Sequence, residues 1–332
     1  MNRLNNCLLN QKKSCLPIWF MRQAGRYLPE FREIRKQNPD FINLCLNSEL
    51  SSKITLQPLE RFDLDAAIIF SDILIVPYAL GQKVDFKKKG GPVLSDFNLK
   101  HFKEVNENKF NETLSPVYKA ISETRKQLKK EKSLICFVGA PWTLIVYMFN
   151  LKNNVNLLKN IDFDISFVLE KLIVFLKLHI ENQFKAGADI VQIFDSWASM
   201  IPLKELDKFC YSPNLKLVEF CKKINLPAIC FPRGINKNYL NFLEKVKPHG
   251  LNIDYEVDPL WARDNLKNDC LQGGMDPKIL LKEEKLIFSE VERYLNIFNN
   301  SPYIFNLGHG LLPETNPEML KKVIEKVKSY RK

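Results

Sequence analysis

Residues 17–32 read Pro-Ile-Trp-Phe-Met-Arg-Gln-Ala-Gly-Arg-Tyr-Leu-Pro-Glu-Phe-Arg, a short apolar run followed by two arginines around an Ala-Gly turn. An apolar run of this length, bounded by turn residues, predicts a buried strand. Arg22 and Arg26 then lie on the loop after the strand, where Gly25 lets the backbone come close to a ligand. Each guanidinium offers a planar fork of donors that matches a carboxylate or a phosphate. The stretch therefore predicts a first strand with an anion-binding loop; the alternative is a strand followed by solvated arginines.

The same kind of run recurs along the chain, and polar segments with helical periodicity separate most of the runs. The eight runs lie at 17–21, 66–70, 134–138, 189–194, 227–231, 250–253, 269–272 and 303–307. Apolar residues at three- and four-residue spacing predict amphipathic helices over 165–186, 203–223, 276–297 and 316–329. Eight strands alternating with helices predict an α/β fold, a (β/α)8 barrel of the TIM type. An open, doubly wound parallel sheet is the alternative.

The first two crossovers, 22–65 and 71–133, are unusually long. They leave room for extra helices and for a hairpin around Gly81, Gly90 and Gly91, which we expect to form a lid or a dimer contact. The sequence contains no evident linker, low-complexity tract or internal repeat. We therefore expect residues 1–332 to form a single domain.

The composition indicates the kind of partner. The chain has 49 Lys and Arg against 38 Asp and Glu, a net charge of +11, which favours nucleic acid, an anionic membrane or a polyanionic small molecule. No RNA-binding or zinc-finger signature accompanies the charge, so we expect no nucleic-acid partner. The eight cysteines form no CxxC pair, which is typical of reduced thiols in a cytosolic protein. Without a signal peptide or a run of about 20 apolar residues, we expect a cytoplasmic protein with no membrane partner.

Unusual polar residues and glycines cluster directly after the apolar runs, where barrel active sites are built. In run order they are Arg22, Gln23, Ala24, Gly25 and Arg26; Ser71 and Asp72; Gly139, Ala140, Pro141, Trp142 and Tyr147; Asp195, Ser196 and Trp197; Arg233 and Gly234; Asp254; Gly273, Gly274 and Asp276; Gly308, His309 and Gly310. We expect these residues to face one mouth of the barrel.

Four of these residues suggest chemistry. Asp72 has apolar neighbours on both sides, where an ionised carboxylate is costly unless a cation or a hydrogen-bond donor meets it. A ligand could be that partner, and the alternatives are a helix N-cap or a pair with Arg22. His309, between two glycines, would be accessible to a ligand, although a lone His is also common as a structural residue. Tyr147 and Ser196 supply neutral hydroxyl groups that can orient carboxylate arms.

Other chemistries have weaker support. The four histidines, His101, His179, His249 and His309, are isolated from one another, so we expect no metal site. The doublets Gly90-Gly91 and Gly273-Gly274 form no GxGxxG or P-loop motif. Gly273, Gly274, Gly308 and Gly310 do follow the last two strands, where many barrels bind phosphate, and a phosphate-ligand enzyme is a competing interpretation.

Seven ordered blocks of the sequence resemble the uroporphyrinogen decarboxylase family: 17–35, 70–81, 139–148, 187–197, 250–261, 271–277 and 305–317. The resemblance implies a (β/α)8 barrel, usually a homodimer, which converts the four acetate side chains of uroporphyrinogen III to methyl groups, giving coproporphyrinogen III, without metal or organic cofactor. It implies substrate contacts at Arg22, Gln23, Ala24, Gly25, Arg26, Asp72, Tyr147, Ser196 and His309, with Arg35 as a further candidate. Ser199, where relatives usually have glycine, and the low glycine count of 12 are departures that concern loop shape.

The implied chemistry fits the residues. A substrate with eight carboxylates suits a basic protein with arginines at the mouth. Its four inward pyrrole N–H groups could meet Asp72, which would stabilise the cation formed when a pyrrole α-carbon is protonated. Arg22 is the best-placed candidate acid, although a pKa above about 12 makes solvent an alternative donor.

Two rivals remain. The methylcobamide:thiol methyltransferases of the same fold need a His-x-Cys zinc motif, which this sequence lacks. A non-catalytic RNA- or tetrapyrrole-binding module would fit the charge but would not need Asp72 among the arginines.

Overall fold

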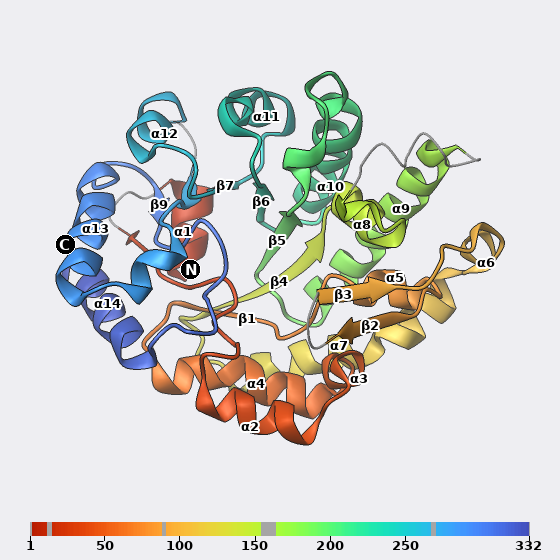
Figure 1. Cartoon of the computed structure of the whole chain (residues 1–332), viewed down its shortest axis with the longest axis horizontal. Helices are drawn as coiled ribbons and strands as arrows, with labels where there is room; N and C mark the ends of the chain where they lie inside the picture. Colours follow the sequence, from red (N-terminus) through yellow and green to blue (C-terminus); the bar gives the residue numbers. More distant parts are fainter. Residues whose placement is uncertain (1, 12–14, 88–90, 154–163, 267–269, 332) are drawn as a thin grey trace.

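A parallel sheet forms the centre of the molecule. The computed structural model describes residues 2–11, 15–87, 91–153, 164–266 and 270–331 (Figure 1). Seven parallel strands follow one another in the order β1-β4-β5-β6-β7-β8-β9. Their bounds are β1 Ala66–Ile68, β4 Ser133–Gly139, β5 Ile190–Asp195, β6 Ala228–Pro232, β7 Gly250–Ile253, β8 Leu271–Gly273 and β9 Tyr303–Ile304. They coincide with seven of the eight predicted runs.

The eighth run, 17–21, closes the ring but is not a regular strand. An isolated bridge joins Ile18 to Phe305 beside β9, where Phe305 N donates to Pro17 O at 2.8 Å. On its other side Asp65 N, just before β1, donates to Ile18 O at 2.9 Å. The segment thus lies between the first and last strands of the sheet. This contact confirms the barrel over the open sheet.

The prediction of a regular first strand was wrong. Side chains accept several of the hydrogen bonds that backbone carbonyl groups of neighbouring strands would accept in a regular sheet. Ile18 N donates to the carboxylate of Asp65 at 2.8 Å and Phe20 N to the amide oxygen of Gln23 at 3.1 Å. Met21 N donates to the amide oxygen of Asn306 at 3.1 Å. We call this closure, formed by 17–23 with Asp65 and Asn306, the seam. It satisfies the buried backbone N–H groups without the regular geometry of a strand.

Apolar side chains and a small polar network fill the barrel. Trp19 Nε1 donates to Gln272 Oε1 at 2.9 Å, and Gln272 Nε2 donates to Asn252 Oδ1 at 2.6 Å. Helix α1 (Arg3–Asn10) contributes Leu4 and Leu8 to the same buried cluster. The helix therefore covers the end of the barrel at which the strands begin.

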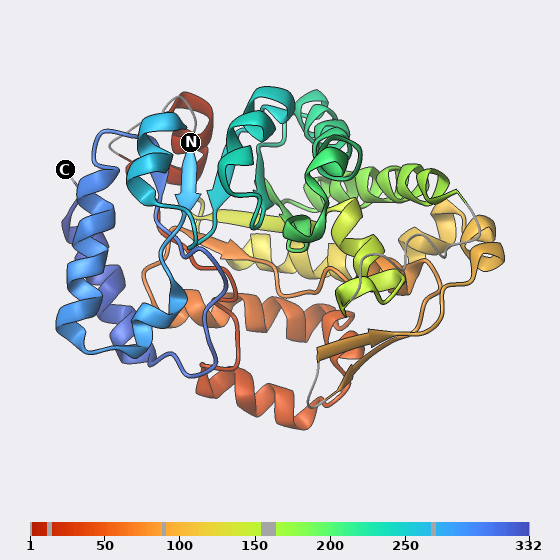
Figure 2. The ribbon, with the colours of Figure 1, turned by 45° about the horizontal axis from the view of Figure 1, so that its top comes forward.

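Helices cover the outside of the sheet, as Figures 1 and 2 show. Those of the long crossovers are α2 Pro29–Gln37, α3 Phe41–Cys45, α4 Ser48–Arg61, α5 Ile75–Ala79, α6 Leu99–Glu104 and α7 Glu107–Gln127. The others are α8 Pro141–Met148, α9 Ile165–Lys185, α10 Ser212–Lys223, α11 Tyr239–Val246, α12 Pro259–Asn265, α13 Glu284–Ile297 and α14 Pro317–Ser329. Short turns of helix are η2 Leu151–Asn153, η4 Ala198–Met200, η5 Leu203–Glu205, η6 Asp207–Tyr211, η7 Asn236–Asn238 and η8 Pro277–Leu281.

The extra helices and the hairpin of the long crossovers are confirmed. The hairpin pairs β2 (Val84–Lys87) with β3 (Gly91–Leu94) and contacts α3. Gly90 lies outside the described residues, and Gly91 has a positive φ of 78°. Whether the hairpin acts as a lid or a dimer contact stays a prediction.

Two predicted helices begin later than expected. Regular α-helix starts only at Ser212 within 203–223, after a π-type turn over η6. Pro213 has no N–H to donate to the preceding turn, which breaks regular helix there. Within 276–297, the short η8 precedes α13, which begins at Glu284. The predictions for 165–186 and 316–329 match α9 and α14.

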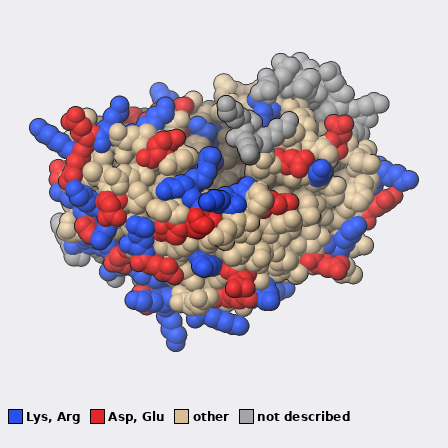
Figure 3. Space-filling view, turned by 60° about the horizontal axis from the view of Figure 1, so that its bottom comes forward, with Lys and Arg blue, Asp and Glu red and all other residues tan. Residues whose placement is uncertain are grey.

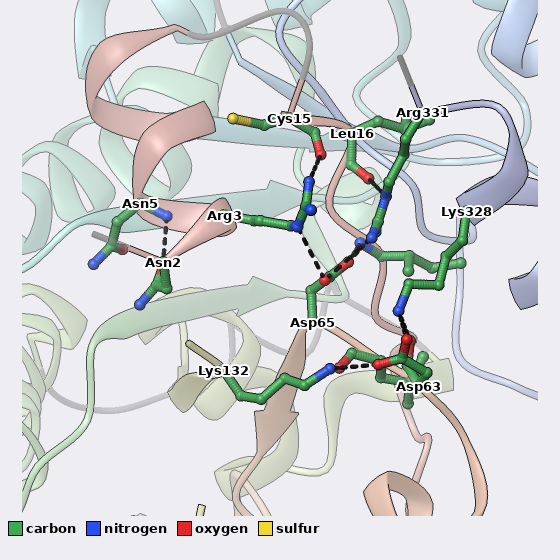
Figure 4. Close-up of polar contacts among 12 residues, drawn as sticks. Asn2, Arg3, Asn5, Cys15, Leu16, Asp63, Asp65, Lys132, Lys328 and Arg331 are labelled. Carbon is green, nitrogen blue, oxygen red and sulfur yellow. Dashed lines mark hydrogen bonds and ion pairs between the residues drawn. The ribbon is translucent and has the colours of Figure 1, made fainter. Parts of the chain in front are cut away.

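The two ends of the chain meet at the N-terminal end of the barrel (Figure 4). The Asp65 carboxylate pairs with Arg331, near the C-terminus, and lies 3.8 Å from Arg3 Nε. Asp63 pairs with Lys132 and with Lys328. These ions border a hollow of about 300 Å³, which lies at the opposite end from the loops that follow the strands. They hold the ends of the chain beside the seam.

All eight cysteines are buried, as expected of core residues, and none of them forms a disulfide in the described part of the chain. No helix in the described part of the chain is long and apolar enough to cross a membrane.

Candidate active site

Arg22 follows the seam in an unusual backbone conformation. Its φ of 60° lies in the left-handed region, which is uncommon for a residue other than glycine. Its neighbour Met21 is held on both sides, by the amide of Asn306 and by Leu311 N, which donates to Met21 O at 2.9 Å. The seam thus fixes the point at which Arg22 leaves the barrel.

The Arg22 side chain lies across Gly310. A Cβ atom at Gly310 would be only 2.4 Å from Arg22 Cδ and 2.7 Å from Cγ. The glycine therefore provides the space in which the stem of Arg22 runs. This packing brings the loop after the first segment together with the loop after β9.

The Gln23 side chain takes part in the seam. It is fully buried, and its Oε1 accepts from Phe20 N while its Nε2 donates to Ala66 O at 3.0 Å. Both ends of the amide are therefore used within the protein. Its backbone is engaged as well, because Gln23 N donates to Phe20 O at 3.1 Å and Gln23 O accepts from Tyr27 OH at 2.8 Å.

The rest of the first loop is more open. Ala24 and Gly25 are half-buried and Arg26 is exposed. Within the described residues, no carboxylate lies within ion-pair distance of Arg26. Arg35, on α2, donates to Asn38 O and stacks on Phe41 with its Cζ 5.3 Å from the ring centroid. The loop therefore presents a free guanidinium at Arg26.

Asp72 lies after β1 and starts a turn. Its Oδ1 accepts from Leu74 N at 2.8 Å, and Ile75 N donates to Asp72 O at 3.3 Å. Burial raises the pKa of Asp72 to about 6, although the Leu74 hydrogen bond and the charge of Arg22 both act to lower it. Among the described residues no ion pair joins Asp72 to Arg22, and its Oδ2 has no hydrogen-bond partner. The carboxylate thus has an oxygen available to a donor on a ligand.

Tyr147 lies on α8 close to the same charges. Burial raises the pKa of its phenol, Asp72 raises it further, and Trp197 and Arg22 act in the opposite direction. The rings of Tyr147 and Trp197 meet edge to face at 6.0 Å, and Lys152 Nζ lies 4.5 Å from the Tyr147 centroid. Ser196 directly precedes Trp197 at the end of β5. Tyr147 therefore lies against the residue that directly follows Ser196.

His309 is half-buried and neutral at neutral pH. Burial lowers its pKa to about 4, and the charges of Arg22 and Arg233 lower it further. Its Nδ1 accepts from Gly310 N at 2.6 Å, which assigns the proton of the neutral ring to Nε2. His309 can therefore donate one hydrogen bond to a carboxylate.

Arg22 is the common neighbour of these groups, because its charge acts on Asp72, Tyr147 and His309. Figure 3 shows a hollow in the surface with Lys and Arg side chains along its edge. The arrangement offers cations and neutral donors to acidic groups and one carboxylate to a positive or N–H-bearing centre. Within the described residues, no group of three or more His, Cys, Asp or Glu side chains could hold a metal ion.

Not every polar residue after a strand faces the mouth. Asp195 is buried and accepts from Thr143 Oγ1 at 2.7 Å, and Asp254 is buried and accepts from Tyr239 OH at 2.8 Å. These carboxylates hold loops together, which corrects the expectation that they face the mouth. Arg233 follows β6 and was expected to face the mouth, but it was not among the substrate contacts that the resemblance implies; its charge acts on His309. Its position before Gly234 at a strand end was the available signal.

Comparisons with known proteins identify the family and the fold. A family model described as uroporphyrinogen decarboxylase matches residues 1–330. Uroporphyrinogen decarboxylase from Rickettsia bellii is 40% identical over 95% of this chain and 95% of its own length. The Jannaschia enzyme of the same name is 37% identical over 98% of both chains. A solved methyltransferase from Methanosarcina mazei has a TM-score of 0.79 at 16% identity, covering 99% of this chain and 98% of its own, which shows a shared fold alone.

Proposed function

The chain belongs to the uroporphyrinogen decarboxylase family, and we propose that it removes CO2 from the four acetate arms of uroporphyrinogen III. The product is coproporphyrinogen III, an intermediate of tetrapyrrole and heme biosynthesis. The observation that carries the proposal is the placement of Arg22 near Asp72, Tyr147 and His309 at the mouth of the barrel. Cations and neutral donors beside one carboxylate match a substrate with acidic arms around a ring of N–H donors.

Asp72 has the central role in the proposed reaction. The free oxygen of its carboxylate accepts hydrogen bonds from the inward pyrrole N–H groups. Protonation of a pyrrole α-carbon then creates a cation, into which the electrons of the breaking bond between the acetate methylene and its carboxylate flow as CO2 leaves. A second proton then converts the resulting exocyclic methylene to a methyl group, and loss of the proton first added at the α-carbon restores the neutral pyrrole. The negative charge of Asp72 stabilises the cation as it develops, which lowers the barrier.

The remaining site residues bind carboxylate arms in this proposal. Arg22 and Arg26 supply guanidinium forks, His309 supplies Nε2–H, and Tyr147 and Ser196 supply hydroxyl groups. Ala24 and Gly25 contribute through the backbone of their loop, and Gln23 contributes by holding that loop to the seam. Arg22 is also the candidate acid. Because its guanidinium does not ordinarily lose a proton, solvent that it holds beside the substrate is the alternative proton donor.

The proposal extends to the assembly and the compartment. We propose a single-domain, cytoplasmic protein, as the sequence pattern indicates, that forms a homodimer without a metal or an organic cofactor, as the family resemblance implies. Sedimentation of the purified protein tests the dimer, and a monomer at micromolar concentration would contradict it. Activity should survive exhaustive chelation, and restoration of a chelated, inactive protein by zinc would overturn the cofactor proposal.

Turnover of the reduced substrate tests the activity. We expect anaerobic incubation with uroporphyrinogen III to release CO2 and to yield a product with four carboxylates. The oxidised, planar porphyrin should not react, because oxidation removes two pyrrole N–H groups and the flexible bridges that let the others converge on Asp72. Absence of CO2 release from uroporphyrinogen would overturn the function, and equal turnover of both forms would overturn the role of Asp72.

A further inference from the structure

Ion pairing separates the arginines of this chain into two groups. Six of them have a carboxylate oxygen within 4.0 Å: Arg3, Arg61, Arg125, Arg263, Arg293 and Arg331. Within the described part of the chain, five have none: Arg22, Arg26, Arg32, Arg35 and Arg233. Four of these five belong to the first loop and α2. Arg233 comes from a different part of the sequence, directly after β6.

The backbone of Arg233 is tied to both neighbouring strand ends. Its N–H donates to Asp195 O at 3.1 Å, and its carbonyl oxygen accepts from Ser199 N at 3.1 Å. The next N–H, of Gly234, donates to Asp254 Oδ2 at 2.7 Å. A Cβ atom at Gly234 would lie 2.6 Å from the Cβ of Ser199, so this turn is tightly packed. The side chain of Arg233 therefore starts from a well-fixed position.

The side chain of Arg233 is half-buried against an aromatic ring. Its Nη2 donates to Tyr255 OH at 3.3 Å, and its Cζ lies 5.9 Å from the Tyr255 centroid. Stacking on a phenol holds a guanidinium in one orientation while leaving other N–H groups free. Arg233 is thus a preorganised fork whose charge no carboxylate of the described chain neutralises.

Arg233 and Arg22 approach His309 from different parts of the barrel. Both charges act on the His309 ring. Arg22 follows the seam beside β9, whereas Arg233 follows β6, with β7 and β8 lying between β6 and β9 in the sheet. The two guanidinium groups therefore lie on separate parts of the rim of one mouth.

We propose that Arg233 binds a carboxylate arm of the substrate, on a different part of the rim from the first loop. This inference rests on the proposed function of the same site. Only the propionate arms are present at every one of the four steps, because each step removes an acetate. A fixed anchor that serves all the steps therefore has to bind a propionate, and we assign that arm to Arg233.

Replacement of Arg233 by methionine tests the proposal. We expect the KM for uroporphyrinogen III to rise about 10- to 100-fold, the loss typical of hydrogen bonds between charged groups, with kcat within about threefold of wild type. Anaerobic calorimetry with coproporphyrinogen III, which carries only propionates, should show a similar rise in Kd. Arg233→Lys keeps a charge but not the fork, and its effect should be smaller than that of the methionine variant.

Arg263→Met is the matched control, because Arg263 is half-buried, as Arg233 is, but pairs with Asp264. Its KM and Kd should equal those of wild type. An unchanged Kd for coproporphyrinogen III in Arg233→Met would overturn the proposal, even if the KM for uroporphyrinogen rose. If the methionine variant does not fold, an unchanged Kd in Arg233→Lys overturns the proposal in the same way. A wild-type protein that binds coproporphyrinogen III without decarboxylating uroporphyrinogen would refute the proposed activity while leaving this binding test intact.

Discussion

Asp72→Asn should lower kcat strongly while leaving the fold at least as stable as before. The amide retains the oxygen that accepts from Leu74 N, a 2.8 Å hydrogen bond in the wild-type structure. It removes the negative charge that we assign to the stabilisation of the protonated pyrrole. We expect kcat to fall by about 100-fold or more, the loss typical of one preorganised electrostatic group.

The effect on stability follows from the pKa of Asp72, which burial raises from 3.8 to about 6. A raised pKa means that ionisation costs more in the folded than in the unfolded state. The wild type is therefore relatively most stable below pH 3.8, and it loses this contribution as the pH rises through about 6. Each pKa unit corresponds to about 1.4 kcal/mol, so the cost above pH 6 is at most about 3 kcal/mol, and residual solvent contact reduces it.

Chemical unfolding at several pH values, combined with steady-state turnover, measures both effects. Asp72→Asn should gain stability relative to wild type at pH 7 and lose that advantage near pH 4. Asp164→Asn is the control, because Asp164 is exposed at the start of α9 and its carboxylate also accepts from the N–H two residues on, that of Ser166, at 2.9 Å. Near-normal kcat in Asp72→Asn would refute the electrostatic role. A variant less stable than wild type at pH 7 would refute the ionisation cost assigned to Asp72.

Three further predictions concern pH, the first loop and the N-terminal end of the barrel. We expect kcat/KM to fall as the pH falls through about 6, because protonation removes the charge of Asp72. The value of kcat should persist to lower pH, because the pyrrole N–H donors stabilise the ionised carboxylate in the complex. A flat kcat/KM profile between about pH 7 and about pH 5 would contradict this. Arg26→Lys should raise KM with little change in kcat, because an ammonium group cannot reproduce a bidentate fork, and wild-type kinetics would mean that Arg26 is an ordinary surface residue. Asp65→Asn should lower the free energy of unfolding by about 3–5 kcal/mol, because it breaks a buried pair with Arg331 beside the seam. Glu284→Gln is the control, because it breaks an exposed pair with Lys322, and it should lower the free energy of unfolding by less than about 1 kcal/mol in a denaturant titration. Equal losses of unfolding free energy in the Asp65 and Glu284 variants would show that the terminal ions do not stabilise the seam.

The local pattern of the sequence predicts most of the barrel but misrepresents its first strand. Seven runs form strands because each is a continuous buried segment, whose apolar character can be read without knowing its neighbours. The run 17–21 has the same composition, yet side chains from Asp65 and Asn306 replace part of its ladder. Those partners are 47 and 285 residues away from the groups they bind, so no local pattern could identify them. The helix start at Ser212 differs from the prediction for a local reason, the missing N–H of Pro213.

The sequence by itself determined which chemistry this chain carries, because that depends on residue types at the ends of strands. Arg22, Asp72, Tyr147 and His309 could be named as candidates from their order along the chain, and the structure shows that the charge of Arg22 acts on the other three. Only the tertiary structure decided which polar residues reach the mouth. In the structure, the carboxylates of Asp195 and Asp254 and the side-chain amide of Gln23 form hydrogen bonds within the protein. Buried polar groups need such partners, and only the fold brings them together. Arg233 was expected at the mouth from its place after a strand, but only the structure shows that no carboxylate of the described residues lies within ion-pair distance of it, because that is a property of position in space and not of sequence.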